Sequence, residues 1–163
     1  MKKSNTIRER IFNAEETGRE VRRLRLKSKT IAFTNGVFDI LHEGHIALLS
    51  KAASFADVLI VGINSDASVK KLKGDSRPIN NENSRALIMA SLIMVDAVVI
   101  FDEATPIELI KIIKPNVLIK GGDYTIDTIV GASEVIEAGG KVEIIPLEEG
   151  FSTTAIINKI STK

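Results

Sequence analysis

The chain of 163 residues contains only two histidines, His42 and His45, which stand three residues apart. In the first turn of a helix this spacing puts both imidazoles on one face. Gly44, between them, lets a ligand approach the backbone closely, and the free N–H groups of a helix N-terminus favour an anion. These features predict a cradle for a phosphate group. A metal pair or a coincidence would be the alternatives, but no convincing third metal ligand stands nearby in the sequence.

Three further segments carry residues suited to phosphates or nucleotides. Lys73 and Arg77 belong to a polar, cationic stretch at 70–79 that is rich in turn formers. The turn Gly121-Gly122-Asp123 lets backbone approach a base or ribose closely. Ser152-Thr153-Thr154 offers hydroxyls and N–H groups to phosphates, or caps a helix, and both roles are compatible.

Five short, mostly apolar runs are typical of strands buried on both faces. They lie at 30–34, 57–63, 97–101, 117–120 and 141–145. Helical patterns alternate with them at about 43–55, 81–94, 105–113, 131–138 and 153–161. This alternation predicts an α/β fold with a doubly wound, Rossmann-like sheet of five parallel strands. Ligands of such sheets bind outside the carboxyl ends of the strands, which the stretch at 70–79 and the segments after the first and fourth strands can reach.

The N-terminal segment differs from the rest. Residues 7–27 have the pattern of a charged helix, so we expect a helical extension over 1–29 and one domain over 30–163. The basic residues in the second half of this helix could grip a phosphate backbone. We favour a solvated face, with cations placed well at a helix C-terminus.

The composition excludes several classes of protein. Hydrophobic residues make up 44% and charged residues 26% of the chain, an ordinary globular mixture. A net charge of +1 predicts no attraction to nucleic acid or to an anionic membrane. There are no cysteines for disulfides or thiolate metal sites. No apolar run approaches the roughly 20 residues of a membrane span. No secretory signal follows Met1, and we expect a cytoplasmic protein.

The combined motifs resemble those of a known superfamily. His42-Glu43-Gly44-His45, after Gly36-Val37-Phe38-Asp39, resembles the HxGH signature of the cytidylyltransferase-like nucleotidyltransferases. The stretch 73–78 resembles their mobile basic loop, 120–124 their nucleotide-binding turn, and 152–154 their C-terminal Ser/Thr phosphate motif. The resemblance covers nearly the whole chain.

Within the superfamily, the segments Thr34-Asn35-Gly36, Lys-Gly-Asp-Ser-Arg-Pro and Lys-Gly-Gly-Asp-Tyr resemble the D-glycero-β-D-manno-heptose 1-phosphate adenylyltransferases. One departure is Val37, where that subgroup often carries cysteine. The resemblance implies transfer of AMP from ATP to the sugar phosphate, which gives ADP-heptose for bacterial surface polysaccharide. It also implies a separate heptose kinase upstream. The alternatives are another acceptor, such as glycerol 3-phosphate or flavin mononucleotide, a CTP-dependent enzyme, or a nucleotide-sensing domain without turnover.

The resemblance also implies residue roles around ATP. His42 and His45 would contact its α- and β-phosphates. Lys73 would be the third catalytic residue, reaching the phosphates from the loop, although Lys70 or Lys71 could take its place. The other implied nucleotide-binding residues are Asn35, Gly36, Val37, Phe38, Gly44, Arg85, Gly121, Gly122, Asp123, Tyr124, Ser152, Thr153 and Thr154.

The remaining implied roles concern the acceptor, the metal and the partners. Thr34, Asp39 and Arg77 would bind the sugar phosphate, with Asp39 either touching substrate or bracing the loop by accepting backbone N–H bonds. Arg85 is expected on the exposed turn of the helix at 81–94, as a phosphate contact or a solvated residue. Mg²⁺ would be held mainly by phosphate oxygens and water, with no protein metal site. The implied partners are small-molecule substrates, and a homodimer is left open.

Overall fold

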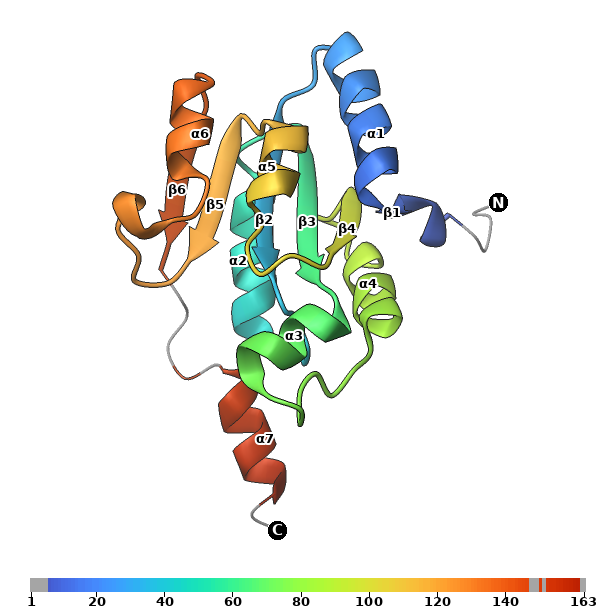
Figure 1. Ribbon diagram of the computed structural model, residues 1–163, viewed down its shortest axis with the longest axis vertical. Coiled ribbons are helices and arrows are strands. Elements are labelled where there is room, and N and C mark those ends of the chain that lie inside the picture. Colours follow the sequence, from blue (N-terminus) through green and yellow to red (C-terminus); the bar gives the residue numbers. More distant parts are fainter. Residues whose placement is uncertain (1–5, 147–149, 151, 162–163) are drawn as a thin grey trace.

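The computed structural model describes residues 6–146, 150 and 152–161, which form a central sheet flanked by helices (Figure 1). Among these residues, six strands form one parallel sheet in the order β1-β4-β3-β2-β5-β6. The strands are β1 (Ile11–Phe12), β2 (Ile31–Gly36), β3 (Val58–Asn64), β4 (Ala97–Phe101), β5 (Val117–Gly121) and β6 (Lys141–Ile145). The helices are α1 (Ala14–Leu26), α2 (Glu43–Ala53), α3 (Asp66–Lys73), α4 (Glu82–Ala90), α5 (Ile107–Ile113), α6 (Ala132–Glu137) and α7 (Thr153–Ser161), with 3₁₀ turns at Arg8–Arg10 and Ile126–Thr128.

The predicted α/β sheet is confirmed, but the prediction of five strands is wrong because the described sheet has six. The additional strand, β1, lies in the segment 7–27 that the sequence pattern assigned to one helix. That helix begins only at Ala14, because Asn13 closes a capping box with Glu16. Each of these two side chains accepts a hydrogen bond of 2.9 Å from the backbone N–H of the other. The two residues before Asn13 then extend along β4.

Helix α3 was also not expected, since its last four residues belong to the stretch assigned to a loop. Ser65 caps the helix by accepting a hydrogen bond of 3.1 Å from the backbone N–H of Ser68. Gly74 ends it with a positive φ of 90°. The lysines that made the stretch look like a loop stand in the last helical turn, where cations interact favourably with the helix dipole.

Both faces of the sheet are covered by helices. Side chains alternate along each strand: on β2, Ile31 and Phe33 pack toward α1, α5 and α6, whereas Ala32 packs toward α2 and α4. All three are fully buried. This double burial explains the continuous apolar runs of the sequence. In the described part of the chain, no helix is long and apolar enough to cross a membrane.

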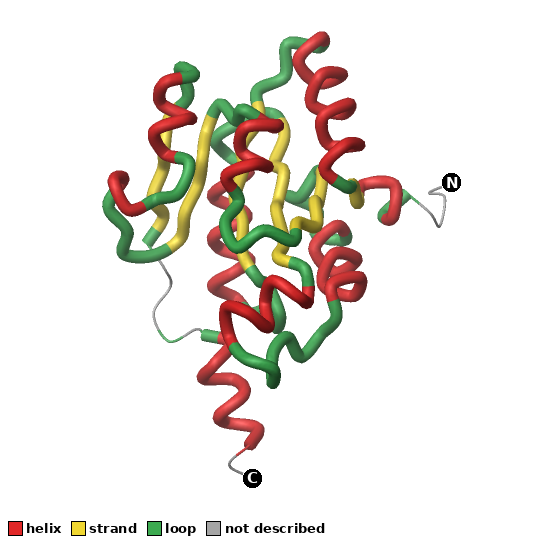
Figure 2. The backbone as a smooth tube through the Cα atoms, in the orientation of Figure 1, coloured by secondary structure: helices red, strands yellow, loops and turns green. Residues whose placement is uncertain are grey.

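The strand order reverses between β2 and β5, which lie side by side in the middle of the sheet. From β2 the chain proceeds outward to β3 and β4, and it then returns to the other side of β2 for β5 and β6. Such a switch point opens a crevice at the carboxyl ends of the two strands. In Figure 1 the arrowheads of β3 and β5 point toward the end of the molecule where α3 and the start of α7 lie. Figure 2 shows the long loop between α3 and α4 at that same end.

Candidate active site

A hollow of about 180 Å³ lies where β2 and β5 end. Its lining comes from the end of β2, the first turns of α2 and the end of β5, and consists of Thr34, Asn35, Gly36, Val37, Phe38, His45, Leu48, Lys120, Gly121 and Tyr124. Apart from Leu48 and Lys120, all of these are predicted site residues. A larger hollow of about 490 Å³ beside β1 and α1 contains no predicted site residue. The switch point therefore brings two of the predicted segments together.

The two histidines stack at the start of α2. His42 is the N-cap residue, and its ring centroid lies 3.8 Å from that of His45, with 22° between the ring planes. The rings of Phe38 and His45 make an edge-to-face contact, with 5.2 Å between their centroids. Phe38 itself has a φ of 47°, so the backbone takes a left-handed conformation at the residue whose ring contacts His45. The predicted placement of both imidazoles on one face is confirmed.

Both imidazoles are neutral at pH 7. Burial, with a smaller contribution from neighbouring His42, lowers the pKa of His45 to about 4. Burial also lowers the pKa of His42. Nδ1 of His45 is buried and has no hydrogen-bond partner in the described part of the chain. An approaching anion favours the protonated imidazole, so the pair can take up charge as a phosphate binds.

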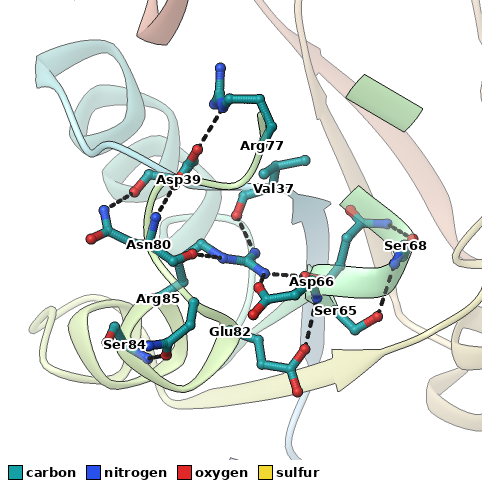
Figure 3. A network of polar contacts seen from close by, with 12 residues as sticks. Val37, Asp39, Ser65, Asp66, Ser68, Arg77, Asn80, Glu82, Ser84 and Arg85 are labelled. Atoms are coloured by element: carbon teal, nitrogen blue, oxygen red, sulfur yellow. Dashed lines mark hydrogen bonds and ion pairs between the residues drawn. The ribbon is translucent and has the colours of Figure 1, made fainter. Parts of the chain in front are cut away.

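Asp39 holds the loop between α3 and α4 against the turn after β2 (Figure 3). Its carboxylate accepts hydrogen bonds from the backbone N–H groups of Ile79 and Asn80, both at 2.8 Å, and from Nε of Arg77 at 2.7 Å. Burial alone would raise the pKa of Asp39, but these hydrogen bonds hold it below its usual value. Of the two expected roles, the structure shows bracing of the loop. With 3% of its surface exposed, Asp39 is not available for the expected contact with substrate.

Arg85 is not on an exposed turn, as the sequence pattern suggested, but is 1% exposed. Its guanidinium donates to the carbonyl oxygens of Val37 at 2.7 Å, Asn64 at 2.7 Å and Asn80 at 3.0 Å. It also donates to Oδ1 of Asp66 at 2.8 Å. These acceptors come from the turn after β2, the end of β3, the loop before α4 and the start of α3 (Figure 3). Because protein acceptors enclose the guanidinium, it is not accessible to a nucleotide in this arrangement.

Lys73 lies exposed at the end of α3, as do Lys70 and Lys71 in the same last turn. Gly74 follows, and a Cβ atom added there would meet nothing within 4 Å. The side chain of Arg77, which is 14% exposed, is tied to Asp39. The reach of Lys73 to a phosphate, and that of Arg77 to either substrate, remain predictions.

The turn after β5 begins at the hollow. Gly122 has a φ of 126° and donates its N–H to the carbonyl oxygen of Ile145 at 3.0 Å, which fixes the turn against β6. Tyr124 lines the hollow with half of its surface exposed, whereas Asp123 is exposed and outside the lining. Lys120 belongs to the predicted nucleotide-binding turn at 120–124 but was given no role of its own; it donates from Nζ to Oδ1 of Asn35 at 2.7 Å. Its place directly before the glycine pair was the available signal.

The C-terminal Ser/Thr motif reaches the segment that leads to the histidines. Ser152 caps α7, since its Oγ accepts from the backbone N–H of Ala155 at 3.0 Å. Oγ1 of Thr153 donates to the carbonyl oxygen of Ile40 at 3.4 Å. The expected capping role is confirmed, and phosphate binding by Ser152, Thr153 and Thr154 remains a prediction. Within the described residues, no group of three or more His, Asp or Glu side chains is placed to hold a metal ion.

A doubly wound parallel sheet, with a histidine pair at a helix N-terminus beside the switch point, has the architecture of a nucleotide-binding domain of the nucleotidyltransferase class. The sequence profile of the cytidylyltransferase-like proteins matches residues 33–163, and the chain belongs to this family of nucleotidyltransferases. The resemblance noted from the HxGH segment is thereby confirmed.

Curated relatives match most of this chain but cover only part of their own length. The chain is 56% identical over 139 residues to the bifunctional protein HldE of Koribacter versatilis, covering 85% of this chain and 29% of that protein. It is 52% identical over 161 residues to the bifunctional protein HldE of Campylobacter jejuni, covering 99% and 33%. The chain thus spans about a third of the length of these relatives.

Solved structures share the fold. The lipopolysaccharide core biosynthesis protein from Thermoplasma volcanium is 27% identical, with a TM-score of 0.59 over 74% of this chain and 97% of that one. The pantoate-β-alanine ligase from Francisella tularensis, with a TM-score of 0.63 at 22% identity, covers 94% of this chain and 78% of its own. At that identity, the second likeness concerns the fold alone.

Proposed function

We propose that this chain transfers AMP from ATP to D-glycero-β-D-manno-heptose 1-phosphate, giving ADP-heptose and pyrophosphate. The observation that carries the proposal is the stacked histidine pair beside the hollow at the switch point. The choice of substrates is supported by the three subgroup segments of the sequence and by the similarity to relatives named bifunctional. Since the chain spans about a third of those relatives, we propose that it performs one of two activities, and that the sugar 1-phosphate is supplied by a sugar kinase.

The reaction needs no strong general base. A phosphate oxygen of the sugar 1-phosphate, already an anion near neutral pH, attacks the α-phosphorus of ATP. The new P–O bond forms as the bond from the α-phosphorus to the bridging oxygen breaks, and pyrophosphate leaves with that electron pair. Catalysis then rests on holding the two phosphates in line and on stabilising charge on the transferring group.

The residues around the hollow suit these tasks. His42 and His45 would donate hydrogen bonds to the α- and β-phosphates and gain protons as charge develops on the leaving group. Lys73 would reach the phosphates from the loop, and the N-terminus of α7 would contact the outer ones. The turn at 121–124 would hold base and ribose. Mg²⁺, held by phosphate oxygens and water, would neutralise part of the triphosphate charge.

A panel assay of pyrophosphate release tests the proposal. Purified protein is given ATP or CTP with heptose 1-phosphate, glycerol 3-phosphate or flavin mononucleotide, in the presence of Mg²⁺. We expect ATP with heptose 1-phosphate to react far faster than any other pair, and ATP with heptose 7-phosphate to give nothing. If CTP is preferred tenfold or more, or if another acceptor reacts while heptose 1-phosphate is inert, the proposed substrates are wrong.

A further inference from the structure

Lys120 occupies an unusual electrostatic position in the hollow. Among the described residues that line it, Lys120 is the only one with an ammonium or guanidinium group, and the imidazole of His45 is neutral at pH 7. The lysine is half-buried at the end of β5, and burial lowers the pKa of its ammonium group. Lysines are rarely buried without a partner.

Among the described residues, no carboxylate forms an ion pair with Lys120. Within the described part of the chain, the lysines in ion pairs are Lys29, Lys111 and Lys141, and each lies at the surface with its Asp or Glu partner. Lys120 instead donates to the neutral Oδ1 of Asn35. An ammonium has three N–H donors, so two remain for other acceptors. Desolvating a cation without an anion beside it costs free energy that a purely structural lysine does not recover.

The same contact orients Asn35. An ammonium can only donate, so it selects the carbonyl end of the Asn35 amide, and the NH₂ end is turned away from Lys120. The two side chains come from neighbouring strands, one residue beyond the register pair Thr34 and Ile119. Together they present N–H donors from both strands at the switch point. The ammonium of Lys120 and the NH₂ group of Asn35 together offer N–H donors and one positive charge, which suits the acceptor oxygens and the negative charge of a phosphate group.

We propose that Lys120, with Asn35 beside it, binds a phosphate group of one of the two substrates in the hollow at the ends of β2 and β5. The inference rests on the proposed function in one respect, namely that both substrates carry phosphates. The bound phosphate supplies the anion that the half-buried ammonium lacks among the described residues. The identity of the substrate is decided by the experiment below.

The test compares Lys120→Met and Lys120→Gln with the wild-type protein, with Lys111→Met as the matched control. Calorimetry measures binding of ATP against adenosine, and of heptose 1-phosphate against the free heptose. We expect either variant of Lys120 to bind one phosphate-bearing ligand about 10- to 100-fold more weakly, the size of a charged hydrogen bond. Binding of the phosphate-free counterpart is expected to change less than twofold. The control, an exposed lysine on α5, should bind every ligand as the wild type does.

The ligand affected assigns the phosphate: loss for ATP places it on the nucleotide, and loss for heptose 1-phosphate places it on the acceptor. Thermal unfolding without ligand adds a second readout. Removing an uncompensated charge should leave the melting temperature unchanged or raise it. Unaltered binding of both phosphate-bearing ligands would overturn the proposal, as would an equal loss for adenosine together with a lower melting temperature. ATP binding is measured without turnover, so this test is independent of the proposed reaction. If the wild-type protein binds ATP but is inert toward heptose 1-phosphate, the proposed acceptor is refuted. Inorganic phosphate then replaces heptose 1-phosphate in the binding measurement.

Discussion

Arg85→Met tests whether this arginine organises the site without touching a substrate. Methionine keeps much of the aliphatic volume and removes the guanidinium. The change eliminates four hydrogen bonds of 2.7 to 3.0 Å and leaves three carbonyl oxygens, those of Val37, Asn64 and Asn80, without this donor. It also removes the guanidinium that forms an ion pair with Asp66.

The magnitude follows from these contacts. Each of the three orphaned carbonyl acceptors costs on the order of 1 kcal/mol or more. Loss of the ion pair adds less than the cost for a fully buried pair, because the side chain of Asp66 is 31% exposed. We therefore expect the free energy of unfolding to fall by about 3–5 kcal/mol. For a chain of this length, each kcal/mol lowers the melting temperature by roughly 2–4 °C, which predicts a fall of roughly 6–20 °C. A domain with about 5–15 kcal/mol of stability remains folded at 25 °C.

Urea and thermal unfolding measure this loss, with Arg22→Met, an exposed arginine of α1, as the control that should change stability by less than about 0.5 kcal/mol. Steady-state kinetics at 25 °C measure activity on the folded variant. A direct phosphate contact by Arg85 would leave the melting temperature within 2 °C or so of the wild type while abolishing ATP binding. That outcome would refute the positioning role.

Three further predictions concern the histidines and the loop. His42→Ala and His45→Ala should each lower kcat by about 10²–10³ while the protein stays folded, and near wild-type turnover of either variant would contradict the phosphate role. The folded state keeps His45 neutral down to about pH 4, whereas the unfolded chain protonates near pH 6.5. Stability should therefore fall as the pH drops through this window, by about 1–3 kcal/mol because the imidazole is partly solvated. Urea unfolding of His45→Ala should lose this dependence, and an unchanged pH profile would show that the cause lies elsewhere. Hydrogen exchange should show the N–H groups of Ile79 and Asn80, both bound to Asp39, protected without ligand, and the rest of the loop between α3 and α4 protected only with ATP and Mg²⁺; equal exchange with and without ATP would argue against loop closure.

The histidine pair was predictable because its signal is local. Two side chains that are three residues apart in the first turn of a helix lie on the same face, and this does not depend on the tertiary structure. The strands were predictable for a similar reason, since burial on both faces produces continuous apolar runs. Strand β1 was not, because two residues are too short to show a period and the capping box at Asn13 was read as the inside of a helix.

Arg85 and Lys120 could not be placed from sequence because their environments are assembled from distant segments. An arginine among polar residues near a helix start normally faces water, and here its burial depends on carbonyl groups from three separate segments. The contact of Lys120 with Asn35 follows from the strand order, which makes β2 and β5 neighbours although two strands separate them in the chain.

The short strand β1 also has a consequence for aggregation. It pairs with Val98 and Val99, in the middle of β4, whose five residues are all apolar. A sheet edge of that composition, once uncovered, is a template for pairing with another chain. Strand β1 pairs with this edge through only two residues, between the charged turn Arg8–Arg10 and helix α1. The outer edge of β1 is therefore too short to pair with a further strand. Removing the segment that contains β1 would therefore expose the edge of β4 to pairing with another chain, and β1 protects the protein against self-association.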